Sequence, residues 1–285
     1  MTSSSRSVAV RTFAYTSLAM VAFAANSVLC RAALGQSLID ASSFAIIRVV
    51  SGAAMLWLIW TLSRSQRGNL SVDWRSALML FLYAVTFSFA YVTLETGTGA
   101  LLLFGLVQLT MISVGLWQGQ RPNALAWAGM VVAIAGLLYL VAPGLSAPSL
   151  HGAVLMGIAG IAWGIYSLRG KRVHEPITAT TGNFMGAVPM ALIVWLFFLQ
   201  DLNLNATGVM LATVSGALTS GVGYVIWYTA LPGLTPTKAA SVQLSVPAIA
   251  GLGGVLLLSE PLTIRLVVAT VAILGGIAIV LSQRH

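Results

Sequence analysis

The sequence predicts an all-α integral membrane protein of ten transmembrane helices, arranged as two inverted repeats of five helices each. Of its 285 residues, 58% are hydrophobic and only 7% are charged, which leaves too little polar surface for a soluble globular chain. The apolar residues form continuous runs long enough to cross about 30 Å of hydrocarbon, without the alternation of a β-barrel. Five such runs occur twice, and an odd number of spans turns the second copy upside down, as is typical of transporters.

The first repeat is predicted over residues 1–145. Its spans are residues 12–30, 43–62, 76–94, 99–117 and 124–142. Each span has the roughly 20 largely apolar residues that a transmembrane helix needs. The charged stretch 63–74 separates the second span from the third, and Glu95 and Arg121 lie at the next two boundaries.

The second repeat is predicted over residues 146–285. Its spans are residues 150–168, 178–199, 207–229, 237–258 and 263–282. It begins within the stretch 143–149, which is rich in Pro, Gly and Ser, because such turn chemistry ends one helix and starts another. The charged connection 169–176 occupies the place that 63–74 has in the first repeat, and no connection is long enough to hold a soluble domain.

Matches between residues support the duplication. Segment 103–110 aligns with segment 238–245, which places Gln108 opposite Gln243, and two further pairs of segments match in the same order. Each match alone is weak, because apolar segments resemble one another. In an inverted architecture, equivalent residues meet near the membrane midplane, where transporters bind substrate. We therefore expect Gln108 and Gln243 to converge there.

The placement of the net charge of +8 predicts the orientation in the membrane. With a cytoplasmic N-terminus, eleven basic residues fall on the cytoplasmic side and three on or toward the other side, as the positive-inside rule requires. The eleven are Arg6, Arg11, Arg64, Arg67, Arg75, Arg121, Arg169, Lys171, Arg172, Lys238 and Arg284. Both termini are therefore predicted to be cytoplasmic, with membrane lipid around the chain and no nucleic-acid partner.

No catalytic constellation is present in the sequence. There is no nucleophile with a nearby base, no phosphate-binding glycine loop and no pair of carboxylates inside a span. Cys30 is the only cysteine and the three histidines lack ligand spacing, so we predict no metal and no cofactor. The six acids lie at or beyond helix ends, which leaves proton coupling unsupported. We predict that the chain is not an enzyme.

Aromatic residues inside the spans are candidates for substrate binding. Tyr83 and Phe87 share a helical stripe on the third span, and Trp163 and Tyr166 share a face of the sixth. Tyr224 lies well inside the eighth span. Such stripes are also typical of core packing and of the interfacial belt. A buried indole N–H or phenol O–H, however, needs a hydrogen-bond partner, which a substrate could supply.

Polar residues near the middle of spans are the second group of candidates. They are Asn26, Gln108, Gln243 and Ser245. Hydrogen bonding between helices is the alternative role for each of them. Pro247, deep in the ninth span, predicts a kink that serves either gating or packing alone.

Arg48 is a basic residue within the apolar run of the second span. It lies a few turns from the extracytoplasmic end, a distance over which long basic side chains can snorkel. We expect Arg48 to snorkel or to hold a structural partner, rather than to bind a substrate carboxylate.

The run 256–263, Leu-Leu-Leu-Ser-Glu-Pro-Leu-Thr, resembles the repeat signature of the EamA-type members of the drug/metabolite transporter superfamily. It follows Pro247, and Trp163 with the glycine after it also matches that pattern. The first repeat departs from the pattern, with Asn26 at the usual Trp-Gly position and Gln120 where a Gly-Glu pattern is common.

Within this superfamily, the sequence most resembles the bacterial aromatic amino acid exporters of the inner membrane. The resemblance implies a central cavity between the halves, alternating access and a neutral, chiefly aromatic, amino acid as substrate, and we expect a monomer. An amino acid with an apolar ring needs aromatic surface and hydroxyl or amide partners, which the spans contain. The alternatives are a broader small-metabolite or drug carrier of the same superfamily and, from another class, a membrane scaffold.

Overall fold

The computed structural model describes residues 3–63, 70–119, 121–144, 147–170, 173, 175–234 and 236–282. Over these residues the chain is helical and without strands, and one isolated bridge joins Ile39 to Leu204. The predicted all-α class is confirmed for this part of the chain. Several predictions fall outside the described residues: the repeat boundary at 145 and 146, the departure at Gln120, and the basic residues Arg64, Arg67, Lys171, Arg172 and Arg284.

Short polar side chains start several of the helices. The elements are α1 (Ser3–Leu34), α2 (Ala41–Leu62), α3 (Trp74–Tyr91), α4 (Thr96–Trp117), α5 (Ala124–Val141), α6 (Leu150–Gly170), α7 (Pro176–Phe197), η1 (Leu199–Asp201), α8 (Ala206–Val214), η2 (Ser215–Val222), α9 (Gly223–Ala230), η3 (Leu231–Gly233), α10 (Pro236–Gln243), α11 (Ser245–Leu258) and α12 (Ile264–Ser282). Asp40, Asp73, Asn123 and Asn205 each accept a first-turn backbone N–H, in α2, α3, α5 and α8 respectively, as N-cap residues do.

Two predicted spans are not uniform α-helices. The span predicted at 207–229 consists of α8, η2 and α9 in one continuous stretch, of which η2 is π-helical. The span predicted at 237–258 is broken at Leu244 into α10 and α11. Pro247 therefore lies in the first turn of α11, where its missing N–H removes no helical hydrogen bond. The predicted kink takes the form of a helix break.

Within the described residues, nine helical stretches are long and apolar enough to cross a membrane. The predicted span 76–94, which forms α3, is not among the nine. Arg75 at its start and the buried polar residues Tyr83, Ser88 and Tyr91 along its length reduce its apolar character. The chain is a multi-pass membrane protein, and the count of ten spans stays a prediction.

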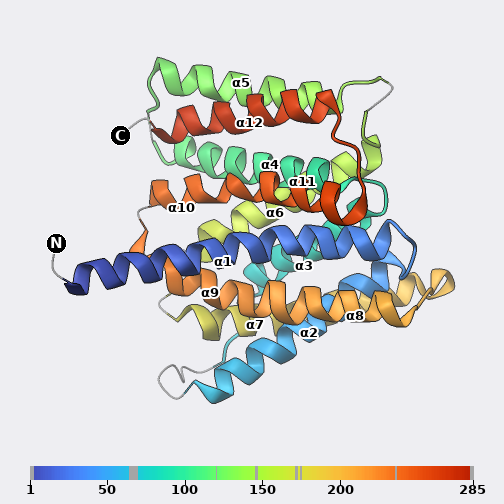
Figure 1. Cartoon of the computed structure of the whole chain (residues 1–285). Coiled ribbons are helices and arrows are strands. Elements are labelled where there is room, and N and C mark those ends of the chain that lie inside the picture. The colour runs from blue at the N-terminus through green and yellow to red at the C-terminus, as the bar shows by residue number, and fades with distance from the viewer. Residues whose placement is uncertain are drawn as a thin grey trace.

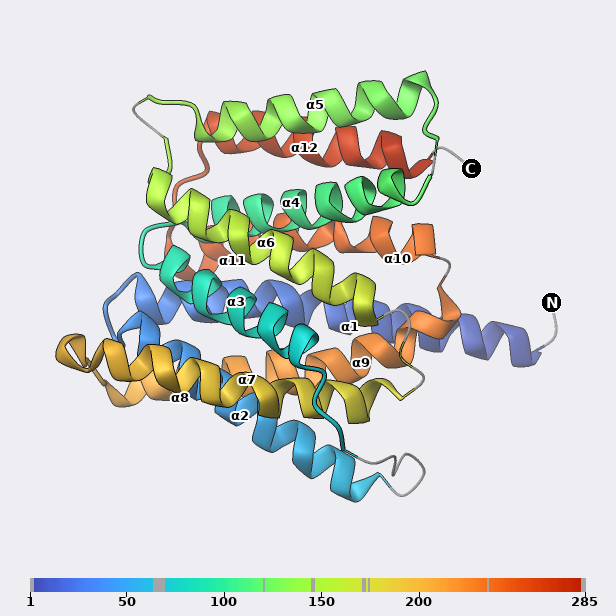
Figure 2. The same ribbon diagram turned by 180° about the vertical axis from the view of Figure 1, so that it is seen from behind.

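The helices lie side by side in one bundle (Figures 1 and 2). α1, α3 and α6 run through the middle, with α4, α5, α11 and α12 on one side of them and α2, α7 and α8 on the other. α1 begins and α12 ends at the same end of the bundle, which we call the terminal end. The outer helices present exposed apolar side chains such as Met210, Leu138 and Val271, which suit contact with lipid.

Candidate functional site

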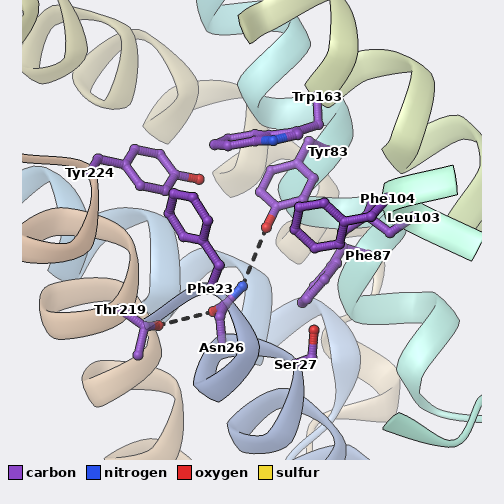
Figure 3. A pocket seen from close by; sticks show the side chains of 10 residues that line it. All are labelled: Phe23, Asn26, Ser27, Tyr83, Phe87, Leu103, Phe104, Trp163, Thr219 and Tyr224. Atoms are coloured by element: carbon purple, nitrogen blue, oxygen red, sulfur yellow. Dashed lines mark hydrogen bonds between the residues drawn. The ribbon is translucent and has the colours of Figure 1, made fainter. Parts of the chain in front are cut away.

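A cavity lies inside the bundle where α1, α3, α4, α6, η2 and α9 meet (Figure 3). Its lining consists of Phe23, Asn26, Ser27, Tyr83, Phe87, Leu103, Phe104, Trp163, Thr219 and Tyr224, and we call it the central chamber. Five of these residues, Asn26, Tyr83, Phe87, Trp163 and Tyr224, are candidates named from the sequence. The chamber has room for about one water molecule, so side chains must move apart before it can hold an organic substrate.

Asn26 connects three helices at the chamber. Its Nδ2 donates to Tyr83 Oη of α3 at 3.3 Å. Its Oδ1 accepts hydrogen bonds from Ser215 Oγ at 2.7 Å and from Thr219 Oγ1 at 3.1 Å. Ser215 and Thr219 both belong to the π-helical segment η2, a type of local structure that is frequent at functional sites. The amide is thereby held in one orientation facing the chamber.

Aromatic rings enclose the rest of the chamber. The centre of the Trp163 ring lies 4.8 Å from that of Tyr83 and 5.0 Å from that of Tyr224. Phe23 packs edge-on against Trp163 at 6.3 Å and against Tyr224 at 5.9 Å. These distances fall in the range of favourable aromatic pairs. The rings come from α1, α3, α6 and α9, so the chamber depends on the packing of segments that are far apart in the sequence.

Arg48 projects from α2 into the interior, and only 2% of the residue is exposed. Its Nη2 donates to Tyr83 Oη at 2.9 Å and its Nε donates to Ser220 Oγ at 3.3 Å. The guanidinium carbon lies 4.9 Å from the centre of the Tyr83 ring and 4.8 Å from that of Phe87. The expectation that Arg48 snorkels is therefore wrong, because α3 and η2 enclose its head group. The structural partners expected as the alternative are Tyr83 and Ser220.

A second cavity, which we call the vestibule, lies at the terminal end of the bundle. Its lining includes Asp73, Ser76, Tyr166, Asn183 and Tyr228, and it has room for several water molecules. The candidate Tyr166 thus lies beside the vestibule and not in the central chamber. Its ring centre is 5.5 Å from that of Trp163, so these two residues form part of the layer that separates the two cavities.

Gln108, Gln243 and Ser245 do not line the central chamber. Gln108 is buried within α4. Gln243 ends α10, and its Nε2 donates to the Ala239 carbonyl at 3.3 Å, while the exposed Ser245 donates from Oγ to the Val242 carbonyl at 2.7 Å. Both side chains are therefore used locally, around the helix break, and the structure does not bring them to the chamber as the sequence led us to expect.

The end of the bundle opposite the vestibule is held by a connected set of polar contacts. Arg31 Nε, at the end of α1, forms an ion pair with Glu260 Oε1 at 3.1 Å, and Arg31 Nη1 donates to the carbonyls of Tyr91 and Val92, each at 3.1 Å. Glu260 Oε2 accepts from the Thr96 backbone N–H at 2.8 Å. Glu260 follows α11, so this group ties α1, α3, α4 and α11 together.

At the vestibule, Asp73 pairs with Arg169 through Oδ2 and Nη2 at 2.6 Å. Partial burial acts to raise the pKa of Asp73, but hydrogen bonds from Arg169 and Ser76 outweigh it and hold the pKa below its ordinary value. In Asp40, burial is likewise outweighed by hydrogen bonds from Ser42 and the Ser43 backbone, and the pKa is lowered. Both carboxyl groups are therefore charged at neutral pH.

Phe23, Ser215, Thr219 and Ser220 contribute to the site without having been predicted from the sequence. Phe23 lies three residues before Asn26, which puts the two on one helical face. Ser215 and Thr219 are four residues apart, again a same-face spacing. That spacing of polar residues within the eighth predicted span was the available signal.

Comparisons with known proteins identify the class. A model of the EamA-like transporter family matches residues 150–282. An uncharacterized protein of Pseudomonas aeruginosa is 51% identical over 274 residues, which cover 96% of each chain. The threonine/homoserine exporter RhtA of Salmonella typhimurium is 31% identical over 174 residues, 58% of this chain and 57% of the exporter. A crystal structure matches with a TM-score of 0.65 at 16% identity, over 93% of this chain and 96% of the other, and shows the fold alone.

The multi-pass helical bundle, its enclosed chamber and these matches define a membrane transporter. The chain belongs to the EamA-like transporter family, within the drug/metabolite transporter superfamily. The family resemblance carried by the run 256–263 and by Trp163 is confirmed. Glu260, the acid of that run, has a structural role in this protein, because it holds Arg31 and the start of α4.

Proposed function

We propose that this protein exports neutral, chiefly aromatic, amino acids across the bacterial inner membrane by alternating access. The observation that supports this most directly is the central chamber, where aromatic rings surround the Asn26 amide and several hydroxyl groups. The Tyr224 hydroxyl is buried without a hydrogen-bond partner among the described residues, and Figure 3 shows it directed toward the chamber. An apolar ring would pack among the aromatic side chains, and the polar groups of an amino acid would bond to Tyr224 and Asn26.

The proposal includes the architecture expected from the sequence. Residues 1–145 and 146–285 form two inverted five-helix repeats with both termini in the cytoplasm. Trp163 and Tyr166 separate the central chamber from the vestibule, and the contacts of Arg31 hold the opposite end together. This arrangement supports a transport cycle in which the chamber opens to one side at a time. One chain supplies the whole chamber lining, which supports a monomer.

The relative that exports threonine and homoserine supports an amino acid as substrate. The rings around the chamber favour a larger apolar side chain over the small polar side chain of threonine. Phe23, Tyr83, Phe87, Phe104, Trp163 and Tyr224 supply those rings. The proposed preference for aromatic substrates therefore rests on the rings of the chamber. The proposed recognition of the amino and carboxyl groups of the substrate rests on the hydroxyl and amide groups of the chamber.

Proteoliposomes that contain the purified protein provide the test. They should move labelled phenylalanine and tryptophan faster than empty liposomes, and unlabelled phenylalanine should compete better than threonine. Movement no faster than in empty liposomes would refute amino acid transport. Stronger competition by threonine would refute the aromatic preference, and competition by sugars instead of amino acids would favour a broader metabolite carrier.

A pair of tryptophan variants separates binding in the chamber from general effects. Trp163 is 7% exposed and lines the chamber, whereas Trp127 of α5 is 49% exposed on the outer surface. Trp163→Leu should weaken phenylalanine transport at least about tenfold, since losing the aromatic contacts costs on the order of 1.4 kcal/mol or more. Trp127→Leu should leave transport unchanged. Equal transport by both variants would show that the central chamber is not part of the transport pathway.

A further inference from the structure

Arg48 is a fully buried cation without an acidic partner. The described residues form two ion pairs, Arg31 with Glu260 and Arg169 with Asp73, and neither includes Arg48. All six aspartates and glutamates of the chain lie among the described residues, and none of their carboxylates lies within 4.0 Å of this guanidinium. A buried ionised group normally has a partner of opposite charge, and the described residues supply none here.

The groups that do contact Arg48 are neutral. Nε and Nη2 donate to the hydroxyl groups of Ser220 and Tyr83, and the rings of Tyr83 and Phe87 lie beside the guanidinium. Nη1 is buried and has no hydrogen-bond partner among the described residues. Hydroxyl groups and rings offset part of the cost of removing a guanidinium from water, but not the whole. Ionisable residues in a membrane interior are costly and normally functional.

Arg48 lies directly behind the wall of the central chamber. Tyr83 and Phe87, whose rings contact Arg48, also line the chamber. The Tyr83 hydroxyl accepts from Arg48 Nη2 at 2.9 Å and from Asn26 Nδ2 at 3.3 Å. It therefore stands between the guanidinium and the amide that faces the chamber. Because the chamber must widen to hold a substrate, a displacement of the Tyr83 side chain would give that substrate access to Nη1 and Nη2.

We propose that Arg48 binds the carboxylate of the transported amino acid. A carboxylate that takes the place of the Tyr83 hydroxyl would receive two parallel N–H bonds from Nη1 and Nη2, the bidentate geometry that arginine favours. The ring of the substrate would then lie toward Trp163. This inference rests on the proposed function, and it defines the substrate class as molecules that combine a carboxylate with an apolar group.

Competition by phenylalanine analogues in proteoliposomes tests the inference. Phenylalanine amide replaces the carboxylate with a neutral amide, and 3-phenylpropionate keeps the carboxylate but lacks the amino group. The wild-type protein should prefer phenylalanine over its amide by about 10- to 100-fold, as expected for a charge-assisted hydrogen bond. In Arg48→Gln this preference should disappear, because phenylalanine loses its interaction with the guanidinium and phenylalanine amide has none to lose. Arg48→Lys should retain part of it.

The ratio of the two ligands distinguishes binding from folding. If Arg48 were only structural, Arg48→Gln would weaken phenylalanine and its amide equally, and that result would overturn the inference. The wild-type ratio is informative even if no Arg48 variant folds, because equal competition by acid and amide would also overturn it.

The panel also separates this inference from the proposed function. If the protein transports phenylalanine and phenylalanine amide competes as well as phenylalanine, the role of Arg48 is refuted but the proposed function is not. Competition by 3-phenylpropionate that depends on Arg48, without any amino acid transport, would refute amino acid export and support the carboxylate site. No interaction with any carboxylate would refute both.

Discussion

Glu95 is a carboxyl group that its surroundings disfavour in the ionised form. Partial burial raises its pKa, and the negative charge of Glu260 raises it further against the opposing charge of Arg31. Glu260 itself is held by Arg31 and by the Thr96 N–H. Glu260 has the contacts that stabilise a charged carboxylate, whereas Glu95, beside it at the start of α4, is the acid whose ionised form is disfavoured.

The raised pKa of Glu95 predicts a pH dependence of stability. The folded state binds this proton more tightly than the unfolded state, so stability rises as the pH falls through the raised folded-state pKa, and ionised Glu95 is unfavourable at neutral pH. Glu95→Gln should raise the melting temperature in detergent at about pH 7 and reduce the gain seen on lowering the pH to about 5. The effect should stay below about 1 kcal/mol, because solvent screens a partly exposed group.

The control for this prediction is Asp201→Asn, in the exposed 3-10 turn η1. It removes one negative charge from a site without the Glu260 neighbour, and should leave the pH response as in the wild type. An identical response of the wild type and Glu95→Gln would show that Glu95 is not the group responsible.

Half of the residues that line the central chamber could be predicted from residue type and helical face. Asn26, Tyr83, Trp163 and Tyr224 were predicted because each is a polar or amphipathic residue inside an apolar span, which requires a partner. The position of Arg48 inside the second span was predicted, but the direction in which its side chain points was not. Whether a long side chain points to the membrane surface or to the interior depends on which helix packs beside it, and the sequence does not specify that neighbour.

At the scale of elements, the contact between α2 and η2 positions the polar side of the chamber. A Cβ on Gly216 of η2 would collide with the Arg48 carbonyl and with Ser51 Oγ, so the two backbones pack directly against each other there. This close approach brings Ser220 to Arg48 and places Ser215 and Thr219 opposite Asn26. The absence of a side chain at Gly216 is therefore a requirement of the site.

We predict that Gly216→Ala destabilises the protein by about 1–3 kcal/mol, the usual cost of forcing extra volume into a packed interior. The colliding atoms include backbone, which cannot rotate away as a side chain can. Thermal unfolding in detergent measures the loss. Gly275→Ala in α12 is the matched control, because a Cβ there meets nothing within 4 Å. Equal stability of the two variants would mean that α2 and η2 are less closely packed than the structure shows.

The helical elements followed closely from apolar length, but their irregularities did not. The spans predicted at 43–62 and 124–142 correspond to α2 and α5 within one or two residues. The π-helical segment η2 has no distinct apolar period over its short length, so it could not be separated from α-helix in the sequence. Pro247 indicated a disturbance of the ninth span, but the break falls three residues earlier, at Leu244.

At the scale of the whole molecule, the two ends of the bundle differ. Each end has an ion pair, Arg169 with Asp73 at the terminal end and Arg31 with Glu260 at the other, and the vestibule lies at the terminal end. The central chamber lies between them, with Trp163 and Tyr166 on the vestibule side. The structure therefore corresponds to a state in which the central chamber is closed, with the vestibule as a separate cavity at the terminal end.

This asymmetry predicts which positions a water-soluble thiol reagent can reach. The native Cys30 is 0% exposed, so cysteines introduced elsewhere give the signal. Ala179→Cys, in the vestibule, should react with a membrane-impermeant maleimide added from the terminal side, because water-sized molecules reach it. Thr219→Cys, in the chamber, should react slowly from either side.

Saturating substrate should raise the reactivity of Thr219→Cys toward reagent added from the side opposite the terminal end, since alternating access must open the Arg31 and Glu260 contacts. Equal reactivity of both cysteines from both sides would contradict separate cavities, and with them the closed chamber.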